Sequence, residues 1–146
     1  MPSSCYSTIT FIGNSETIEE LFQNKFDPEL YLPTPPSVGE EDMSWISWRY
    51  AHWGTKRFYS YTVLQKGVRG MRIKITTARS PPSAFFRFLL DKFPDLFLKC
   101  EFSVDDGYSG IFIGKTDEEG VKVVTHSWED LEHGDFEDAL QGESNE

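Results

Sequence analysis

Cysteine is scarce in this sequence, with only Cys5 and Cys100 among its 146 residues. Two cysteines so far apart give neither the density of a disulfide-stabilised domain nor the spacing of a zinc site. Long apolar runs are also missing, since no stretch approaches the roughly 20 residues that a membrane helix needs. The N-terminal residues lack the basic flank of a secretion signal. We therefore expect free, buried thiols, no membrane segment, and an intracellular protein that is not secreted.

The motifs of common enzyme classes are missing as well. The sequence contains no Gly-x-Ser-x-Gly, no phosphate-binding Gly-x-x-x-x-Gly-Lys, no His-Glu-x-x-His and no Cys-x-x-Cys. Its three histidines, His52, His126 and His133, stand far apart in the chain. We expect a protein that is not an enzyme, with no catalytic residues, no metal ligands and no cofactor.

Aromatic residues, in contrast, are abundant at 15% of the chain, and 12 of them are Phe. Disordered chains are poor in aromatics, so this composition indicates a folded core built largely from rings. The length suits one domain. We expect a single domain at 1–125, with an insertion at about 27–54 that contains four prolines and a Trp-rich helix. An acidic segment at 126–146 should form a short helix and then a frayed end.

Two periodicities divide the chain into elements. Apolar residues that alternate with polar ones predict strands, and apolar residues spaced along one helical face predict helices. The expected elements are, in order, a strand at 5–12, a helix at 15–26, a proline-rich extended connection at 27–42, a short helix at 43–53, strands at 58–65 and 71–77, a helix from Ser80 to Pro94, and strands at 96–103, 108–115 and 121–125. Ser80 should cap its helix with Pro81 in the first position, and residues 127–130 resemble a capping box.

This order of elements predicts an α+β fold. Its central part corresponds to the β-α-β-β-α-β unit of a ferredoxin-like sandwich with an antiparallel sheet, to which an extra C-terminal hairpin strand is added. Both main helices should then cover one face of the sheet. We expect Ile9, Ile73 and Leu98 to point toward Leu21 and Leu89, and the first and last core strands to lie side by side.

Charge is distributed unevenly along the chain. Between Arg49 and Lys92 there are ten basic residues and one acidic residue, although the whole chain carries a net charge of −10. From His126 onward there are eight acidic residues and no Lys or Arg. Two interpretations stay open. The basic span forms a patch that meets phosphate or an acidic partner, or the acidic C-terminal segment folds back over it and neutralises it.

The segment at 53–56, Trp-Gly-Thr-Lys, is the first candidate for a binding site. Lys56 and Arg57 follow the end of a predicted helix, where Gly54 allows a close approach of the backbone. Trp48 and Trp53 add rings, which either pack in the core or stack on a ligand. Alternatively, Gly54 only ends the helix and the next residues lead into a strand.

Arg72 and Lys74 are the second candidate. They alternate with apolar residues in the strand at 71–77, so they should lie on the face of the sheet that the helices leave open. RNA-recognition sheets carry aromatic rings on that face, whereas this strand carries none. Tyr59 and Tyr61 supply rings only if they point outward. The expected mode is contact with the phosphate backbone rather than with bases.

Several local signatures follow one another in the order of a known family. They are Cys5 with Gly13, the motif Trp48-Arg-Tyr-Ala-His-Trp-Gly-Thr-Lys56, Ser80-Pro-Pro82, Phe93-Pro-Asp-Leu96, and the segment at 101–110. Over about residues 5–115 the chain resembles the YubB-type ferredoxin-like domain of bacteriophage and plasmid genomes. His52 and Arg57 depart from the family pattern, which has Asn and Trp there. The resemblance implies the fold and a viral or mobile-element source, with a place in the host cytoplasm, nucleus or virion, but no activity.

Three functional hypotheses result. The first is a non-enzymatic accessory protein of phage or viral type that acts through contacts with an unknown protein or with nucleic acid. The second is a nucleic-acid-binding module that uses the basic span at 49–92 to contact the phosphate backbone. The third is an enzyme with a site near residues 53–56, which would need a deep pocket and a titratable group with a shifted pKa.

Overall fold

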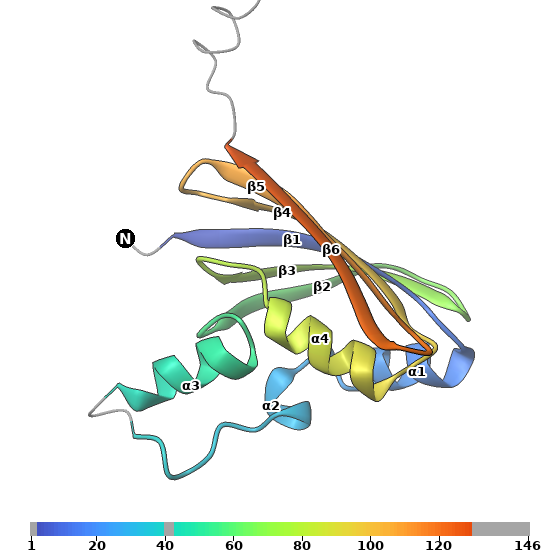
Figure 1. The fold of residues 1–146 in the computed structure, drawn as a ribbon, viewed down its shortest axis with the longest axis horizontal. Helices are drawn as coiled ribbons and strands as arrows, with labels where there is room; N and C mark the ends of the chain where they lie inside the picture. Colours follow the sequence, from blue (N-terminus) through green and yellow to red (C-terminus); the bar gives the residue numbers. More distant parts are fainter. Residues whose placement is uncertain (1–2, 40–42, 130–146) are drawn as a thin grey trace, which may run out of the picture.

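A computed structural model describes residues 3–39 and 43–129 of the chain. These residues form an α+β structure in which helices lie on one side of a twisted antiparallel sheet (Figure 1). The strands are β1 (Ser4–Ile12), β2 (Phe58–Lys66), β3 (Gly70–Ala78), β4 (Phe97–Val104), β5 (Tyr108–Asp117) and β6 (Gly120–Glu129). The helices are α1 (Ser15–Gln23), α2 (Pro28–Tyr31), α3 (Ser44–His52) and α4 (Ser83–Lys92).

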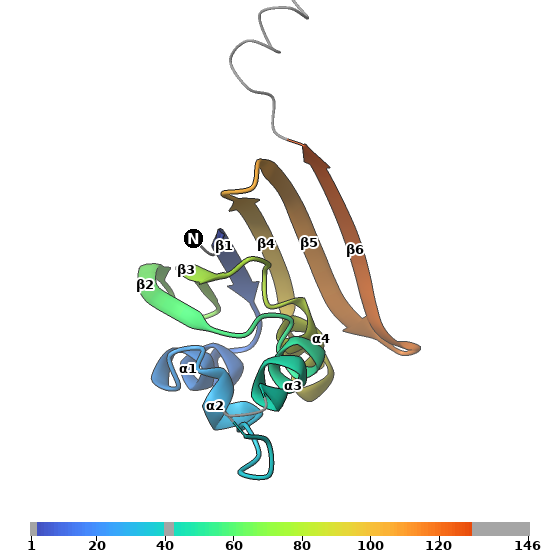
Figure 2. The ribbon, with the colours of Figure 1, turned by 90° about the vertical axis from the view of Figure 1, so that its left-hand side faces the viewer.

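The strands are arranged in the order β2-β3-β1-β4-β5-β6, and each neighbouring pair is antiparallel. The first strand is therefore central, between β3 and β4. This arrangement confirms the prediction of an antiparallel α+β fold and of a first strand beside the last core strand. Figure 2 shows β4, β5 and β6 side by side at one edge of the sheet.

The core lies between the sheet and the helices. Ile9, Ile73 and Leu98 are fully buried in one cluster with Leu21 and Leu89. Alternation along the strands thus places the apolar residues on the helix side, as predicted. A group of phenylalanine rings fills the space between the layers; for example, Phe26 contacts Phe11, Phe85 and Phe86 at centroid distances of 5.4, 5.0 and 6.1 Å.

Both cysteines are buried as free thiols, in agreement with the prediction from their number. Burial raises the pKa of the Cys5 thiol and raises that of Cys100 to about 12. The hydroxyl of Ser7 lies 3.7 Å from the Cys5 sulfur. A thiol with a raised pKa is protonated at neutral pH and therefore unreactive.

The C-terminal part of the described chain differs from the prediction. The last strand was expected at 121–125, and a helix was expected to begin at residue 127. Instead β6 continues through Glu129, because β5 provides a partner for each of its residues from Gly120 to Glu129. Ser127 pairs with Gly110 in that ladder, so it cannot cap a helix. The rest of the predicted acidic segment, residues 130–146, lies outside the described residues.

Two further predictions about helices were wrong. The connection at 27–42 contains a short helix, α2, whose first turn has Pro28 and whose N-cap is Asp27. The helix expected to have Pro81 in its first position begins two residues later, at Ser83, with Pro82 at the N-cap. Ser80 does not cap it, because its hydroxyl donates a hydrogen bond to the carbonyl oxygen of Gly54 at 2.7 Å.

Within residues 3–39 and 43–129, no helix combines the length and apolar character that crossing a membrane requires.

Candidate functional site

The predicted site residues fall in two separate places. Trp48, Trp53 and Gly54 lie in the helix layer at the end of α3, and Arg57 follows them just before β2. Arg72 is on the other face of the sheet, which the helices leave open. The two groups are therefore on opposite sides of the molecule and do not form one site.

Trp53 is a structural residue. Its side chain is only 2% exposed, and its Nε1 donates a hydrogen bond to the carbonyl oxygen of Leu32 at 2.9 Å. The indole thereby holds the proline-rich connection against the end of α3. Trp48 is partly buried against the core, and its ring stacks on that of His52 at a centroid distance of 4.3 Å.

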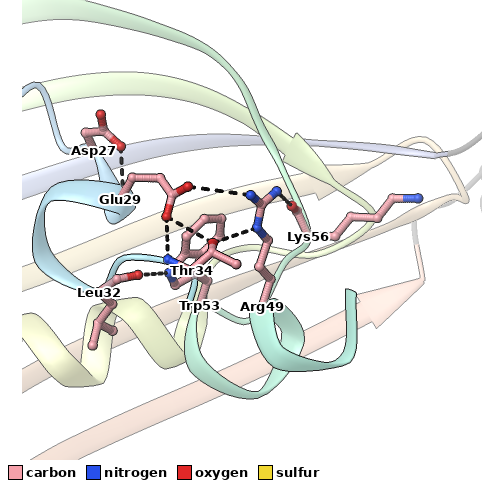
Figure 3. A network of polar contacts seen from close by, with 7 residues as sticks. All are labelled: Asp27, Glu29, Leu32, Thr34, Arg49, Trp53 and Lys56. Carbon is pink, nitrogen blue, oxygen red and sulfur yellow. Dashed lines mark hydrogen bonds and ion pairs between the residues drawn. The ribbon is translucent and has the colours of Figure 1, made fainter. Parts of the chain in front are cut away.

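Arg49 joins α3 to the segment around α2 (Figure 3). Its Nε donates to Thr34 Oγ1 at 3.1 Å, and one terminal nitrogen donates to the carbonyl oxygen of Lys56 at 3.1 Å. The other terminal nitrogen lies 3.6 Å from a carboxylate oxygen of Glu29. The guanidinium also lies over the ring of Trp53, 4.6 Å from its centroid. Each of its three nitrogens therefore has a protein partner.

Gly54 occupies a position that only glycine fits. Its φ angle is +88°, in the region that other residues rarely adopt. A Cβ at this position would lie 2.7 Å from the backbone nitrogen of Ser83 and 3.0 Å from that of Ala84. The hydroxyl of the buried Thr55 donates to the carbonyl oxygen of Ala78 at 2.7 Å. The Trp-Gly-Thr segment therefore ties the end of α3 to the start of α4 and to the end of β3.

Lys56 and Arg57 complete this junction. Lys56 contributes its carbonyl oxygen to Arg49, while its side chain extends away from the network (Figure 3). The guanidinium of Arg57 lies 5.0 Å from the ring centroid of Trp45, and its carbonyl oxygen accepts a hydrogen bond from the backbone of Ala78. Most polar groups of the junction are thus engaged in holding elements together, which matches the alternative that the segment only ends a helix and leads into a strand.

Arg72 and Lys74 are exposed on the open face of β3, where the sequence placed them. Arg72 lies opposite Thr10 of β1, to whose hydroxyl its Nε donates at 3.4 Å, and Lys74 lies opposite Thr8. The pairing with β2 places Thr62 on the other side of Lys74. Hydroxyl groups therefore flank both cations, and the helices lie on the opposite face.

Three more lysines belong to the same face. The registers of β4, β5 and β6 place Lys99, Lys115 and Lys122 on the side that carries Arg72 and Lys74. Among the described strand residues, this face carries five basic side chains and two acidic side chains, Glu101 and Asp117. We call it the open basic face. Its charge is opposite in sign to the net charge of −10 on the whole chain.

Two of these lysines have local partners. Lys99 lies 3.4 Å from a carboxylate oxygen of Glu101, and Lys122 lies 3.1 Å from one of Glu119 in the turn before β6. Both ion pairs are exposed, so each is weak and readily exchanged for another anion. Between Arg72 and the end of the β2–β3 hairpin there is also a surface hollow of about 300 Å³, lined in part by Ile12 and Gln65.

Two exposed aromatic rings, Tyr6 of β1 and Trp128 of β6, lie on the open basic face as well. The predictions from sequence did not include them. Alternation along β1 was sufficient to place Tyr6 on the face of the strand away from the buried Cys5. Its position near Lys74 follows only from the pairing of β1 with β3, which the sequence alone does not give. Trp128 was missed because residues 127–130 were expected to form a helix. Tyr59 and Tyr61 belong to β2, and Tyr61 pairs with Ile75 on the helix side.

The ten basic residues of the span at 49–92 do not form one patch. Lys66 contacts Glu19 of α1 at 3.0 Å on the helix side, and Arg49 is held inside the junction. The prediction that the acidic segment at 126–146 covers basic surface falls mainly on residues beyond 129, which lie outside the described residues.

The described residues contain no group of three or more His, Cys, Asp or Glu side chains suited to hold a metal ion.

Comparison of the chain with models of known protein families, with curated proteins and with solved structures gave no significant match. The fold and the surfaces described above are therefore the basis for any functional assignment.

Proposed function

We propose that this protein is a non-enzymatic binding protein whose open basic face contacts the phosphate backbone of nucleic acid. The observation that carries the proposal is the charge of this face, with five basic side chains against two acidic side chains in a protein of net charge −10. A uniformly acidic protein repels a polyanion, whereas a face of opposite sign attracts it and orients the approach.

The chemistry of the face agrees with phosphate as the ligand group. Arg72 and Lys74 are two residues apart on one strand, so both side chains point in the same direction. Thr8, Thr10 and Thr62 place hydroxyl donors beside them. Lysine, arginine and threonine side chains all contact phosphate oxygens in nucleic-acid complexes, and such contacts position the ligand without selecting its sequence.

The strand order supports a finer description of the fold. In the β2-β3-β1-β4 part of the sheet, the first strand lies between the third and the fourth, and both main helices cover one face. We infer a ferredoxin-like topology from this order, extended by β5 and β6.

The proposed phage or viral source depends on the resemblance of local motifs alone, and the proposed intracellular location depends on the two buried free thiols.

A site near residues 53–56 receives less support than the open basic face. Trp53, Gly54 and Thr55 are buried or tightly packed, and their polar groups have partners in the protein. The partners of Arg49 likewise lie within the fold. An enzymatic role at this segment therefore stays a prediction without a specific observation in its favour.

The proposal is tested by charge reversal on two faces. Arg72→Glu with Lys74→Glu removes two cations from the open basic face. Arg87→Glu with Lys92→Glu changes the net charge equally at exposed positions of α4, on the helix side of the sheet. Affinity for a fluorescent oligonucleotide is measured by anisotropy over a range of salt concentrations. We expect the first variant to lose at least about tenfold in affinity and its salt slope to fall by about 1.4, the value for two phosphate contacts with a single strand.

The α4 variant should lose far less, because only the general repulsion between protein and polyanion increases. Equal losses in both variants would show that net charge, not the open basic face, governs binding. Absence of binding by the unaltered protein at about 50 mM salt would also refute the proposal, because phosphate contacts are strongest at low salt.

A further inference from the structure

Two aromatic rings stand in one row across the open basic face. Tyr6 is 42% exposed and Trp128 is 48% exposed. The strand registers connect them directly, since Tyr6 lies opposite Ser103, Ser103 opposite Ser109, and Ser109 opposite Trp128. Three strand spacings of about 4.8 Å separate the two positions by about 14 Å.

The surface between these rings is low. Serine side chains occupy the two intervening positions of the row, Ser103 of β4 and Ser109 of β5. Serine is much smaller than an aromatic residue, so both rings project above the floor between them. The imidazole of His126 lies on the same face as Trp128, with a centroid distance of 5.7 Å and an angle of 37° between the rings. Flat groups therefore occur at both ends of a shallow serine floor.

One cation of the open basic face, Lys74, lies close to Tyr6. Tyr6 pairs with Thr76 of β3, and Lys74 is two residues before Thr76 on the same strand. A residue in this diagonal position is about 7–8 Å away, within reach of a long side chain. A phosphate bound at Lys74 would therefore have its attached base near the Tyr6 ring. This combination of a cation and an adjacent exposed ring is the arrangement that binds unpaired nucleotides.

We infer that the open basic face binds single-stranded nucleic acid, with unpaired bases stacked on Tyr6 and Trp128. The inference rests on the proposed function and specifies its ligand. In a duplex the bases are already stacked on one another, so their flat faces cannot reach the rings. Stacking also tolerates any base, so the site should distinguish single strands from duplexes rather than one sequence from another.

The experiment compares three ligands at equal phosphate concentration. The first is an oligothymidylate of about 12 nucleotides, a length within the range of single-strand binding sites. The second is its duplex with oligoadenylate at equal phosphate concentration. The third is an abasic oligomer of deoxyribose phosphate, which has the charge but no bases. Anisotropy gives the affinity of each ligand for the full chain and for the Tyr6→Ala, Tyr6→Phe and Trp128→Ala variants.

We expect each alanine variant to bind oligothymidylate roughly five- to 150-fold more weakly, the cost of losing one stacked base. Tyr6→Phe should bind like the unaltered protein because it keeps the ring. Binding of the abasic oligomer should be weaker and the same in all variants. The unaltered protein should also bind the single strand more tightly than the duplex.

Tryptophan fluorescence provides an independent readout. Trp128→Phe removes the emission from the open basic face and leaves that of Trp45, Trp48 and Trp53 in and beside the α3 segment. Oligothymidylate should quench the unaltered protein and have little effect on Trp128→Phe, while the abasic oligomer should quench neither.

The outcomes separate this inference from the proposed function. If no ligand binds, both are wrong. If the abasic oligomer binds as tightly as oligothymidylate and the alanine variants are unchanged, phosphate binding stands and base stacking is refuted. If the emission of Trp128 depends on protein concentration without any ligand, a second copy of the chain covers the ring, and the inference is also refuted.

Discussion

The substitution Gly54→Ala tests the structural role of the Trp-Gly-Thr segment most directly. The φ angle of +88° is unfavourable for alanine, at a cost of about 1–3 kcal/mol. The new Cβ would also lie 2.7 Å from the backbone nitrogen of Ser83, a distance that real Cβ atoms do not tolerate. Separating α4 from α3 to relieve this contact costs a further amount of about 1–3 kcal/mol, as for an overpacked core.

The total loss of about 2–6 kcal/mol is a large part of the roughly 5–15 kcal/mol by which a domain is stable. Urea unfolding followed by circular dichroism measures it. With a slope near 2 kcal/mol per molar urea, the midpoint should fall by about 1–3 M.

Gly107→Ala is the matched control for this experiment. Gly107 has a φ angle of +100°, and no atom lies within 4 Å of the position where its Cβ would be. Alanine at position 107 should therefore cost only the roughly 1–3 kcal/mol of the unfavourable φ angle. The difference between the two variants in the free energy of unfolding gives the cost of the steric conflict between a Cβ at position 54 and the start of α4.

An equal loss in the Gly54 and Gly107 variants would refute the assignment of Gly54 to a tight structural junction. The folded Gly54→Ala protein should also keep its affinity for oligonucleotides, because the open basic face lies on the other side of the sheet. Reduced affinity at unchanged folding would instead favour a binding site at residues 53–56.

Three further predictions concern the junction and the core. Arg49→Lys keeps the charge but cannot reach three partners at once, so the free energy of unfolding should fall by about 1–3 kcal/mol in urea titrations, and an unchanged value would show that the network contributes nothing. Thr55→Val keeps the shape but removes the hydroxyl's hydrogen bond to the Ala78 carbonyl oxygen, which still accepts one from the backbone N–H of Ser80, so it should cost about 0.5–1.5 kcal/mol in the same assay, whereas a neutral result would contradict the buried hydrogen bond. Burial raises the pKa of Cys100 to about 12, above the value of about 8.5 in an unfolded chain, so the stability from its neutral thiol is complete below about pH 8.5 and is lost as the pH rises toward 12. Urea midpoints between about pH 8 and 11 should therefore fall less steeply for Cys100→Ala than for the unaltered protein, and parallel curves would refute the assignment.

The parts of the fold that were predictable are those encoded by local periodicity. Alternation in the first strand and in β3 placed Ile9 and Ile73 correctly on the helix side, because a buried face imposes a strict period of two. The hairpin between β2 and β3 was also evident from the glycines at Gly67 and Gly70 between two β-rich segments. These features require no knowledge of distant residues.

The predictions that failed depend on contacts between distant segments. The second half of β6, Thr-His-Ser-Trp-Glu, has little apolar alternation, and its extended form follows from the ladder with β5. Ser80 has the sequence context of a helix cap, but its hydroxyl binds the carbonyl of Gly54, which is 26 residues earlier in the chain. A tertiary partner thus took precedence over the local preference in both cases.

Only part of the candidate site could be predicted from the sequence, for a related reason. Arg72 and Lys74 could be placed together because they share one strand. Lys99, Lys115 and Lys122 come from three other strands, and only the sheet order and register bring them to the same face. No single segment therefore contains the pattern that makes the face basic.

The same geometry explains why a run of basic residues in the sequence is a poor guide to a basic surface. Successive side chains of a strand point to opposite faces, so the sheet separates neighbours in the sequence and unites residues from different strands. Lys66 thereby reaches Glu19 on the helix side, whereas Lys99, which lies outside the basic span, joins Arg72 on the open face. Net charge averages over both faces. A value of −10 therefore does not exclude a polyanionic partner, because that partner interacts with the charges of the one face that it contacts.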